Sequence, residues 1–209
     1  MLKTDFVWPS EPIIIVDVEG NGHTPPDLVE VGIASFPPME NRELLSWLIK
    51  PVNRITWLAQ RIHGIKNAEL ESCQSWAEIM DDVEQHLQNR WFVAHNASVD
   101  YGVMKRHLPE WSPVGVIDTL KLARHVYPNA KSHRLESLLI DTGLRDKVAD
   151  QLHRAADDAY ATALLLDHLI EKSSASTWQE ICKIAQLKTQ PYEQSPPPEQ
   201  GSLWGNLFF

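Results

Sequence analysis

The chain has 209 residues, 43% of them hydrophobic, and a formal net charge of −9. This composition excludes a disordered or fibrous protein, and the acidic balance excludes a protein that grips duplex DNA with its whole surface. No apolar run approaches the roughly 20 residues of a membrane span, and residues 1–10 do not resemble a signal peptide, so no membrane partner is expected. The sparse cysteines, Cys73 and Cys182, fit a cytoplasmic location.

Four segments are expected along the chain. Residues 1–11 read as a loose N-terminal arm, residues 12–172 as the main domain, and residues 173–188 as an extra C-terminal helix. Residues 189–209 differ in composition, with four prolines between Gln190 and Gln200 ahead of an apolar tip. This composition predicts a flexible tail that ends in an apolar peptide.

The N-terminal third predicts three strands: Ile13–Asp17, Leu28–Phe36 and Leu44–Ile49. The first is a β-branched run that ends in acid, and the turn residues of Asn21–Asp27 separate it from the second. Sequential strands with short connections favour an antiparallel meander.

From about residue 79 helices alternate with short apolar runs. Strands are expected at Trp91–Ala94 and Val114–Ile117. Helices are expected through Ile79, Val83 and Leu87, at Ser98–Leu108 with Ser98 as N-cap, through Arg124, at Leu135–Ile140 closed by Gly143, at Ala155–Ile170 and at Trp178–Leu187. The pattern predicts an α/β fold, a mixed five-stranded sheet with helices on both faces.

Acidic residues occur where several of these elements end. Asp17 and Glu19 are two residues apart on a strand, so their side chains share one face, where they repel each other unless a cation lies between them. Asp100 falls in the first turn of the helix that follows strand Trp91–Ala94. Taken singly, these could equally be solvated acids and an ordinary helix-terminal acid.

His153 precedes the long helix, which carries Asp157 and Asp158 in its first turn. Asp158 shares a largely apolar stripe with Ala155, Thr162, Leu165 and Leu169, so it is expected to face the sheet. Asp157 lies on a more polar stripe. Together, Asp17, Glu19, Asp100 and Asp158 could converge as ligands of Mg²⁺ or Mn²⁺, two ions of which could hold a phosphodiester, with His153 as general base.

These residues resemble the motifs of the DEDDh 3′→5′ exonucleases, whose fold is RNase H-like. Asp17 and Glu19 match the first motif, Asp100 the second, and His153 and Asp158 the third, where a histidine precedes the aspartate by five residues. Coverage runs from about Ile13 to Ile170, with the closest likeness to the exodeoxyribonuclease X and proofreading ε-subunit branches. Leu28–Gly32 resembles the family's second strand, and Ile62–Ile65 its His-Gly-Ile segment.

The resemblance implies hydrolysis of 3′-terminal phosphodiesters of DNA, at single strands or frayed 3′ ends, to 5′-mononucleotides, with a role in DNA repair or proofreading. A ribonuclease of the same family and an inactive nucleic-acid-binding module are the alternatives. Substrate contacts are expected from Val18, Gly20, His63, His95 and Asn96, although His63 could equally be a packed loop histidine. Gly20 stands where the family usually has threonine, so backbone N–H groups of residues 20–22 would replace that contact.

Two further features bear on partners. Six basic residues could guide the strand or simply lie on solvated helix faces: Lys105, Arg106, Lys121, Arg124, Lys131 and Arg134. In the tail, Gln200, Leu203 and Trp204 resemble the short peptides that bind bacterial sliding clamps. The alternative is that this tip folds back on the domain or binds nothing.

Overall fold

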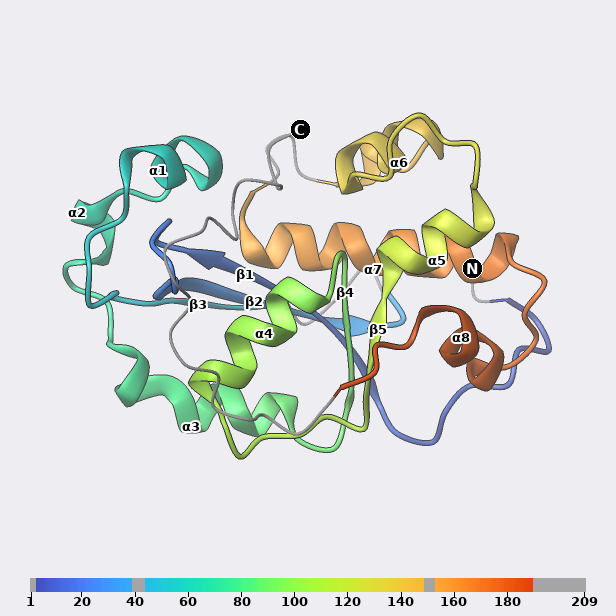
Figure 1. Ribbon diagram of the computed structural model, residues 1–209, viewed down its shortest axis with the longest axis horizontal. Helices are drawn as coiled ribbons and strands as arrows, with labels where there is room; N and C mark the ends of the chain where they lie inside the picture. The colour runs from blue at the N-terminus through green and yellow to red at the C-terminus, as the bar shows by residue number, and fades with distance from the viewer. Residues whose placement is uncertain (1–2, 39–43, 149–152, 190–209) are drawn as a thin grey trace.

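A computed structural model describes residues 3–38, 44–148 and 153–189. Its centre is a mixed five-stranded sheet in the order β3-β2-β1-β4-β5 (Figure 1). The strands are β1 (Ile13–Gly20), β2 (Leu28–Phe36), β3 (Leu44–Leu48), β4 (Trp91–Ala94) and β5 (Gly115–Asp118). β1, β2 and β3 form the expected antiparallel meander, and β4 and β5 run parallel to β1.

The helices fill the connections and the C-terminal part. They are α1 (Trp57–His63), α2 (Asn67–Leu70), α3 (Trp76–Leu87), α4 (Ser98–His107), α5 (Thr119–Val126), α6 (Leu135–Asp141), the 3₁₀ turn η1 (Arg145–Lys147), α7 (Ala155–Lys172) and α8 (Trp178–Ala185). Sequence patterns did not predict α1 and α2, which are too short to show a clear apolar period. None of the helices in the described part of the chain has the length and apolar character to cross a bilayer.

Alternate residues of β1 enter two separate cores, as strand geometry requires. Ile13 and Ile15 pack with residues of α5, α7 and α8, whereas Ile14 and Val16 pack with residues of α3 and α4. Figure 1 shows the same division, with α7 on one side of the sheet and α3 and α4 on the other. The prediction of helices on both faces is therefore confirmed.

Gly32 of β2 allows α7 to start directly against the sheet. A Cβ atom at this position would lie 2.1 Å from the carbonyl carbon of Ala155 and 2.2 Å from the backbone nitrogen of Ala156. No side chain larger than hydrogen fits there, so the first turn of α7 contacts the backbone of β2 itself. The close approach matters because Gly32 pairs with Asp17 on β1.

Two local expectations are corrected. The described part of the N-terminal arm, residues 3–11, is not loose, because Phe6 is buried and Val7 exchanges backbone hydrogen bonds with Ser176 and Trp178. Ser98 is not the N-cap of α4 but its first residue. The N-cap is Ala97, whose side chain cannot accept a hydrogen bond, so no side chain caps the helix.

The outer edge of β5 is also covered. Ile117 forms an antiparallel bridge with Gln186, and the backbone N–H of Leu187 donates to the carbonyl of Val116 at 2.9 Å. The segment after α8 therefore lies against β5 and runs toward the end of that strand where Gly115 begins.

Candidate functional site

Asp17 and Glu19 continue the row of β1 side chains that faces α7. Ile13 and Ile15 of this row are buried under the helix, and the two acids follow where α7 begins. In the register of β1 and β2, Asp17 lies opposite Gly32 and Glu19 opposite Glu30. The strand therefore delivers both carboxylates to the N-terminal end of α7, as the spacing of the acids predicts.

Asp158 and His153 meet Glu19 at this end of the sheet. Asp158 is buried, as its stripe predicts, and its Oδ2 accepts a hydrogen bond from the backbone N–H of His153 at 3.0 Å. Ligand atoms of Glu19, His153 and Asp158 all lie within 4.8 Å of one another. His153 itself is exposed, in a left-handed backbone conformation with φ of 75°.

Asp100 reaches the cluster from the next strand. The parallel pairing of β1 with β4 ends at Ile15 and Val93, so the backbone N–H of Val18 has no β4 partner in that ladder. The Oδ1 atom of Asp100 accepts this N–H at 3.2 Å. The first turn of α4 thus places the carboxylate where the two strands separate, a position that the helix dipole favours.

The cluster is electrostatically frustrated as it stands. Burial, and then the neighbouring carboxylates, raise the pKa of Asp17 and Glu19 well above their ordinary values. Burial also raises the pKa of Asp100 to about 7 and that of Asp158 to about 6. Four neighbouring acids, two of them buried and two half-buried, that resist ionisation together are a strong attractor for cations.

The donor set fits a hard divalent cation. The Oδ1 atom of Asp158 is buried and has no hydrogen-bond partner, so it retains a free lone pair inside the cluster. Carboxylate oxygens with one nearby imidazole are a ligand set that suits Mg²⁺ or Mn²⁺. Structural zinc sites are built mainly from cysteine and histidine. Asp17, Glu19, Asp100 and Asp158 are the residues that would hold such ions.

Glu30 is a further buried acid near this end of the sheet, and it was not singled out from the sequence as part of the site. Its carboxylate accepts hydrogen bonds from Arg154, from the backbone N–H of Ala155 and from the hydroxyl of Ser46. Protein donors therefore neutralise Glu30, unlike the other four acids. Its one sequence signal is an acid in the otherwise apolar run Leu28–Ala34, which forms β2.

Three of the expected substrate-binding residues lie beside the cluster. Gly20 follows Glu19 at an irregularity in the β1–β2 ladder, and Val18 has its backbone N–H bonded to Asp100. His63 ends α1 and is 2% exposed, with its Nε2 lacking a partner and its Nδ1 accepting the N–H of Ile65. Burial lowers the pKa of His63. The backbone of Gly20 and the carboxylate of Glu30 act in the opposite direction and raise it, whereas His153 lowers it further.

The other two expected contacts, His95 and Asn96, lie in the loop before α4 and hydrogen-bond it to neighbouring segments. Both ring nitrogens of His95 are engaged, with the hydroxyl of Thr119 at 2.9 Å and the carbonyl of His133 at 2.8 Å. The backbone N–H of Asn96 donates to Asp118. The ring of His95 therefore offers no free nitrogen, and its two hydrogen bonds hold this loop against Thr119 and His133.

The basic residues and the tail residues that were expected to contact partners fall into three groups. Lys105 and Arg106 bond to backbone carbonyls of Pro109, Trp111 and Pro26. Lys121, Arg124, Lys131 and Arg134 are exposed. Gln200, Leu203 and Trp204 of the tail lie outside the described residues.

Known proteins resemble this chain over most of its length. A family model described as Exonuclease (RNase T) matches residues 14–166. The 3′-5′ exonuclease DinG of Bacillus subtilis is 30% identical over 166 residues, which are 76% of this chain and 18% of DinG. A PolC-type DNA polymerase III of Thermotoga petrophila is 27% identical over 90% of this chain and 14% of its own length. The chain thus spans less than a fifth of these relatives.

Solved structures agree in fold. Exonuclease X in complex with 5′ overhanging duplex DNA superposes with a TM-score of 0.67 and 28% identity, over 82% of this chain and 98% of that one. The nuclease domain of 3′hExo, a DEDDh family member bound to rAMP, gives 0.65 at 13% identity, over 86% and 98%. The sheet and helices therefore form the RNase H-like exonuclease fold. Because the exonuclease family model matches residues 14–166, well over half of the chain, the protein belongs to the exonuclease family.

Proposed function

We propose that this protein is a metal-dependent 3′→5′ exodeoxyribonuclease that prefers single-stranded DNA and releases 5′-mononucleotides. The observation that carries the proposal is the convergence of Glu19, His153 and Asp158 within 4.8 Å, with Asp100 bonded to the backbone of the strand that carries Asp17 and Glu19. Four carboxylates beside one exposed histidine suit phosphodiester hydrolysis.

The residues divide the chemistry between them. Two bound divalent cations would stabilise the developing charge on the phosphate oxygens and lower the pKa of a bound water. Asp17, Glu19, Asp100 and Asp158 would hold these ions. His153, exposed at the rim, would take the proton from the attacking water, while its backbone bond to Asp158 keeps it at the cluster.

The comparisons support DNA as the substrate. The Exonuclease X structure contains duplex DNA and is 28% identical to this chain, whereas 3′hExo bound to rAMP is 13% identical. A 3′→5′ exoribonuclease is the second candidate, because another neighbour recognises the 3′ end of a histone mRNA stem-loop. The same mechanism would serve both.

The test is release of mononucleotides from 3′-labelled and 5′-labelled single-stranded DNA and RNA of matched sequence. The expected result is trimming from the 3′ end of DNA with Mg²⁺ or Mn²⁺ that is abolished by EDTA and by Asp17→Ala and falls at least about a hundredfold in His153→Ala. Asp157→Ala is the matched control, since this half-buried acid adjoins Asp158 but faces another stripe. Faster trimming of RNA would move the substrate to RNA, and binding without trimming would favour an inactive module.

We also propose that the tail binds a bacterial sliding clamp through Gln200, Leu203 and Trp204. The support is the motif itself, at the end of a Pro-rich segment that would act as a tether. A synthetic peptide of residues 196–209 should bind purified clamp in a fluorescence titration. Equal binding by a peptide with Leu203→Ala and Trp204→Ala would contradict the proposal.

A further inference from the structure

A basic stretch stands out in this acidic chain. Residues 44–68 contain no aspartate or glutamate, although the whole chain has a formal net charge of −9. The same residues include four cations, all exposed: Lys50, Arg54, Arg61 and Lys66. This segment forms β3, α1 and the start of α2, so these four cations lie on consecutive elements with no acidic residue between them.

The same stretch exposes large apolar side chains. Val52 is 93% exposed, Trp57 69% and Leu58 52%. Of the phenylalanine, tyrosine and tryptophan side chains in the described residues, Trp57 is the only exposed one. A tryptophan normally contributes its area to a core or an interface, and the other described tryptophans are at least partly buried.

Arg61 lies over Trp57, one helical turn further along α1. Its guanidinium carbon is 4.8 Å from the centre of the indole ring, within the range of a cation–π contact. A planar indole beside a planar guanidinium provides two surfaces on which bases stack. We call the side chains of Arg54, Trp57, Leu58 and Arg61 the outer α1 surface.

This surface is connected to the acidic cluster through α1. At the start of the helix, the backbone N–H of Thr56 donates to the carbonyl of Asn21, two residues after Glu19. Further along, the helix packs on Gly22, where a Cβ atom would lie 3.0 Å from that of Ala59, and the helix ends at the buried His63. Trp57 and His63 are six residues apart on the helix, about 9 Å at 1.5 Å per residue. At about 3.4 Å per step of a stacked strand, that length takes about two to three steps from the 3′-terminal nucleotide.

We propose that the outer α1 surface binds the single strand a few nucleotides upstream of the 3′ end held at the acidic cluster. A base stacks on the indole face of Trp57 that lies away from Arg61, and Arg54 and Arg61 neutralise phosphates. Charge complementarity and continuity with the active site make a nucleic-acid strand the occupant. The inference rests on the proposed function, and extends it from the scissile bond to the upstream strand.

The experiment compares substrates of two lengths. For trimming of a 12-nucleotide single strand, Trp57→Ala should raise KM about tenfold with kcat unchanged. A tenfold change is about 1.4 kcal/mol, which lies within the contribution of one stacked base. Trp57→Phe retains a ring and should stay within about threefold of the wild type. A dinucleotide is too short to reach Trp57, so its kcat/KM should be the same in all three proteins.

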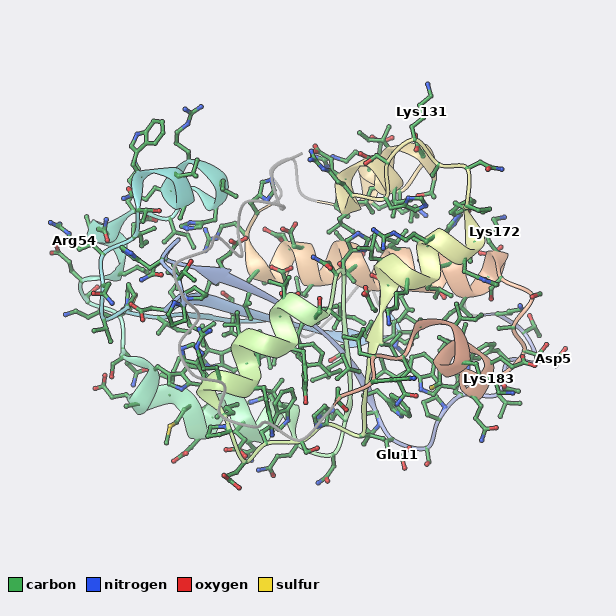
Figure 2. All side chains as sticks on the ribbon, in the orientation of Figure 1. Asp5, Glu11, Arg54, Lys131, Lys172 and Lys183 are labelled. Atoms are coloured by element: carbon green, nitrogen blue, oxygen red, sulfur yellow. The ribbon has the colours of Figure 1, made fainter. Side chains whose placement is uncertain are left out.

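Binding gives a readout that does not depend on turnover. In a His153→Ala background, fluorescence anisotropy with the labelled 12-mer should show the same tenfold loss for Trp57→Ala. Arg54→Ala with Arg61→Ala should lower the slope of log K against log salt by about 1.4, or about 0.7 per phosphate. The control is Lys172→Ala with Lys183→Ala, which removes two exposed charges at the opposite end of the molecule from Arg54 (Figure 2) and should leave the slope unchanged.

The outcomes separate the two proposals. Trimming by the wild type with an unaltered KM in Trp57→Ala and in the double arginine variant overturns the surface and leaves the proposed function standing. Binding that depends on Trp57, without any 3′ trimming by the wild type, supports the surface and overturns the proposed function. Binding of the 12-mer that ignores Trp57 and both arginines assigns the surface to another class of partner and overturns the inference.

Discussion

Arg154 donates two hydrogen bonds to Glu30, from Nε to Oε2 at 3.0 Å and from Nη2 to Oε1 at 3.2 Å. Glu30 faces Glu19 across the β1–β2 ladder, yet the two acids have different roles. Glu30 is neutralised by Arg154, whereas Glu19 is one of the four acids that would hold a cation. Because Arg154 follows His153 directly, this ion pair also ties β2 to the residue that is expected to move the proton.

Loss of the Arg154 side chain should therefore destabilise the fold. Arg154→Met leaves a carboxylate that is 1% exposed without its ion-pair partner, and the free energy of unfolding should fall by about 2–3 kcal/mol. Ser46→Ala, which removes one neutral donor from the same carboxylate, should cost about 1 kcal/mol. Urea unfolding of both variants tests this, and equal losses would contradict it.

Gly32→Ala should damage both stability and activity. The new methyl group would overlap the backbone of Ala155 and Ala156, so α7 must shift and carry Asp158 away from Glu19. We expect a loss of about 2–4 kcal/mol in unfolding free energy and at least tenfold in kcat. Gly102→Ala is the control: nothing lies within 4 Å of its Cβ, and in the middle of α4 it should stabilise by up to about 1 kcal/mol. Wild-type kcat in Gly32→Ala would show that α7 need not touch β2.

The metal-free protein should lose stability as pH rises. The folded-state pKa values of Asp100 and Asp158, about 7 and about 6, lie above those of the unfolded chain. The folded state therefore binds protons more tightly, and this stabilisation, complete below about pH 4, disappears as pH passes through 6 and 7. In EDTA the unfolding free energy should be lower at pH 8 than at pH 5, and Mg²⁺ should raise Tm more at pH 8. Equal Mg²⁺ shifts at both pH values would refute this account.

Neutralising one acid should likewise stabilise the metal-free protein. Asp100→Asn removes a charge from the cluster and keeps an oxygen for the Val18 N–H, so at pH 8 it should gain about 1–3 kcal/mol while losing activity. Asp118→Ala is the contrasting variant, because Asp118 is buried but accepts N–H groups of Asn96 and Leu120. It should lose about 1–2 kcal/mol. Calorimetry in EDTA distinguishes the two.

His153 should matter for turnover and little for stability. Its ring is exposed, so His153→Ala should change the unfolding free energy by less than about 0.5 kcal/mol while kcat falls about 10²- to 10⁴-fold. His153→Gly suits the left-handed backbone at this position and leaves space for a free base. Added imidazole should restore part of its activity, whereas failure of rescue alongside a large loss of stability would indicate a structural role.

Periodicity made the cluster predictable. On a strand, alternate residues share a face, which places Asp17 and Glu19 in the row of Ile13 and Ile15. On a helix, the apolar stripe selects Asp158 over Asp157, and the structure buries Asp158 while leaving Asp157 only half-buried. These rules depend on neighbours in the chain, and they apply wherever an element is long enough to show its period.

Contacts between distant residues escaped the same reasoning. Glu30 and Arg154 are 124 positions apart, and Val7 pairs with residues near 176, so neither contact has a local signature. α1 forms because Thr56 caps its start and Gly64 takes a left-handed conformation at its end, and because the helix packs on Asn21 and Gly22. Seven residues show too little of a helical period to be recognised without those contacts.

The bridge from Gln186 and Leu187 to β5 has a consequence for solubility. β5 is a terminal strand of the sheet, with a row of backbone groups directed away from β4. Such a row is a template for strand exchange between molecules unless something occupies it. Because the segment after α8 pairs with Val116 and Ile117, another molecule cannot pair with β5 at these residues.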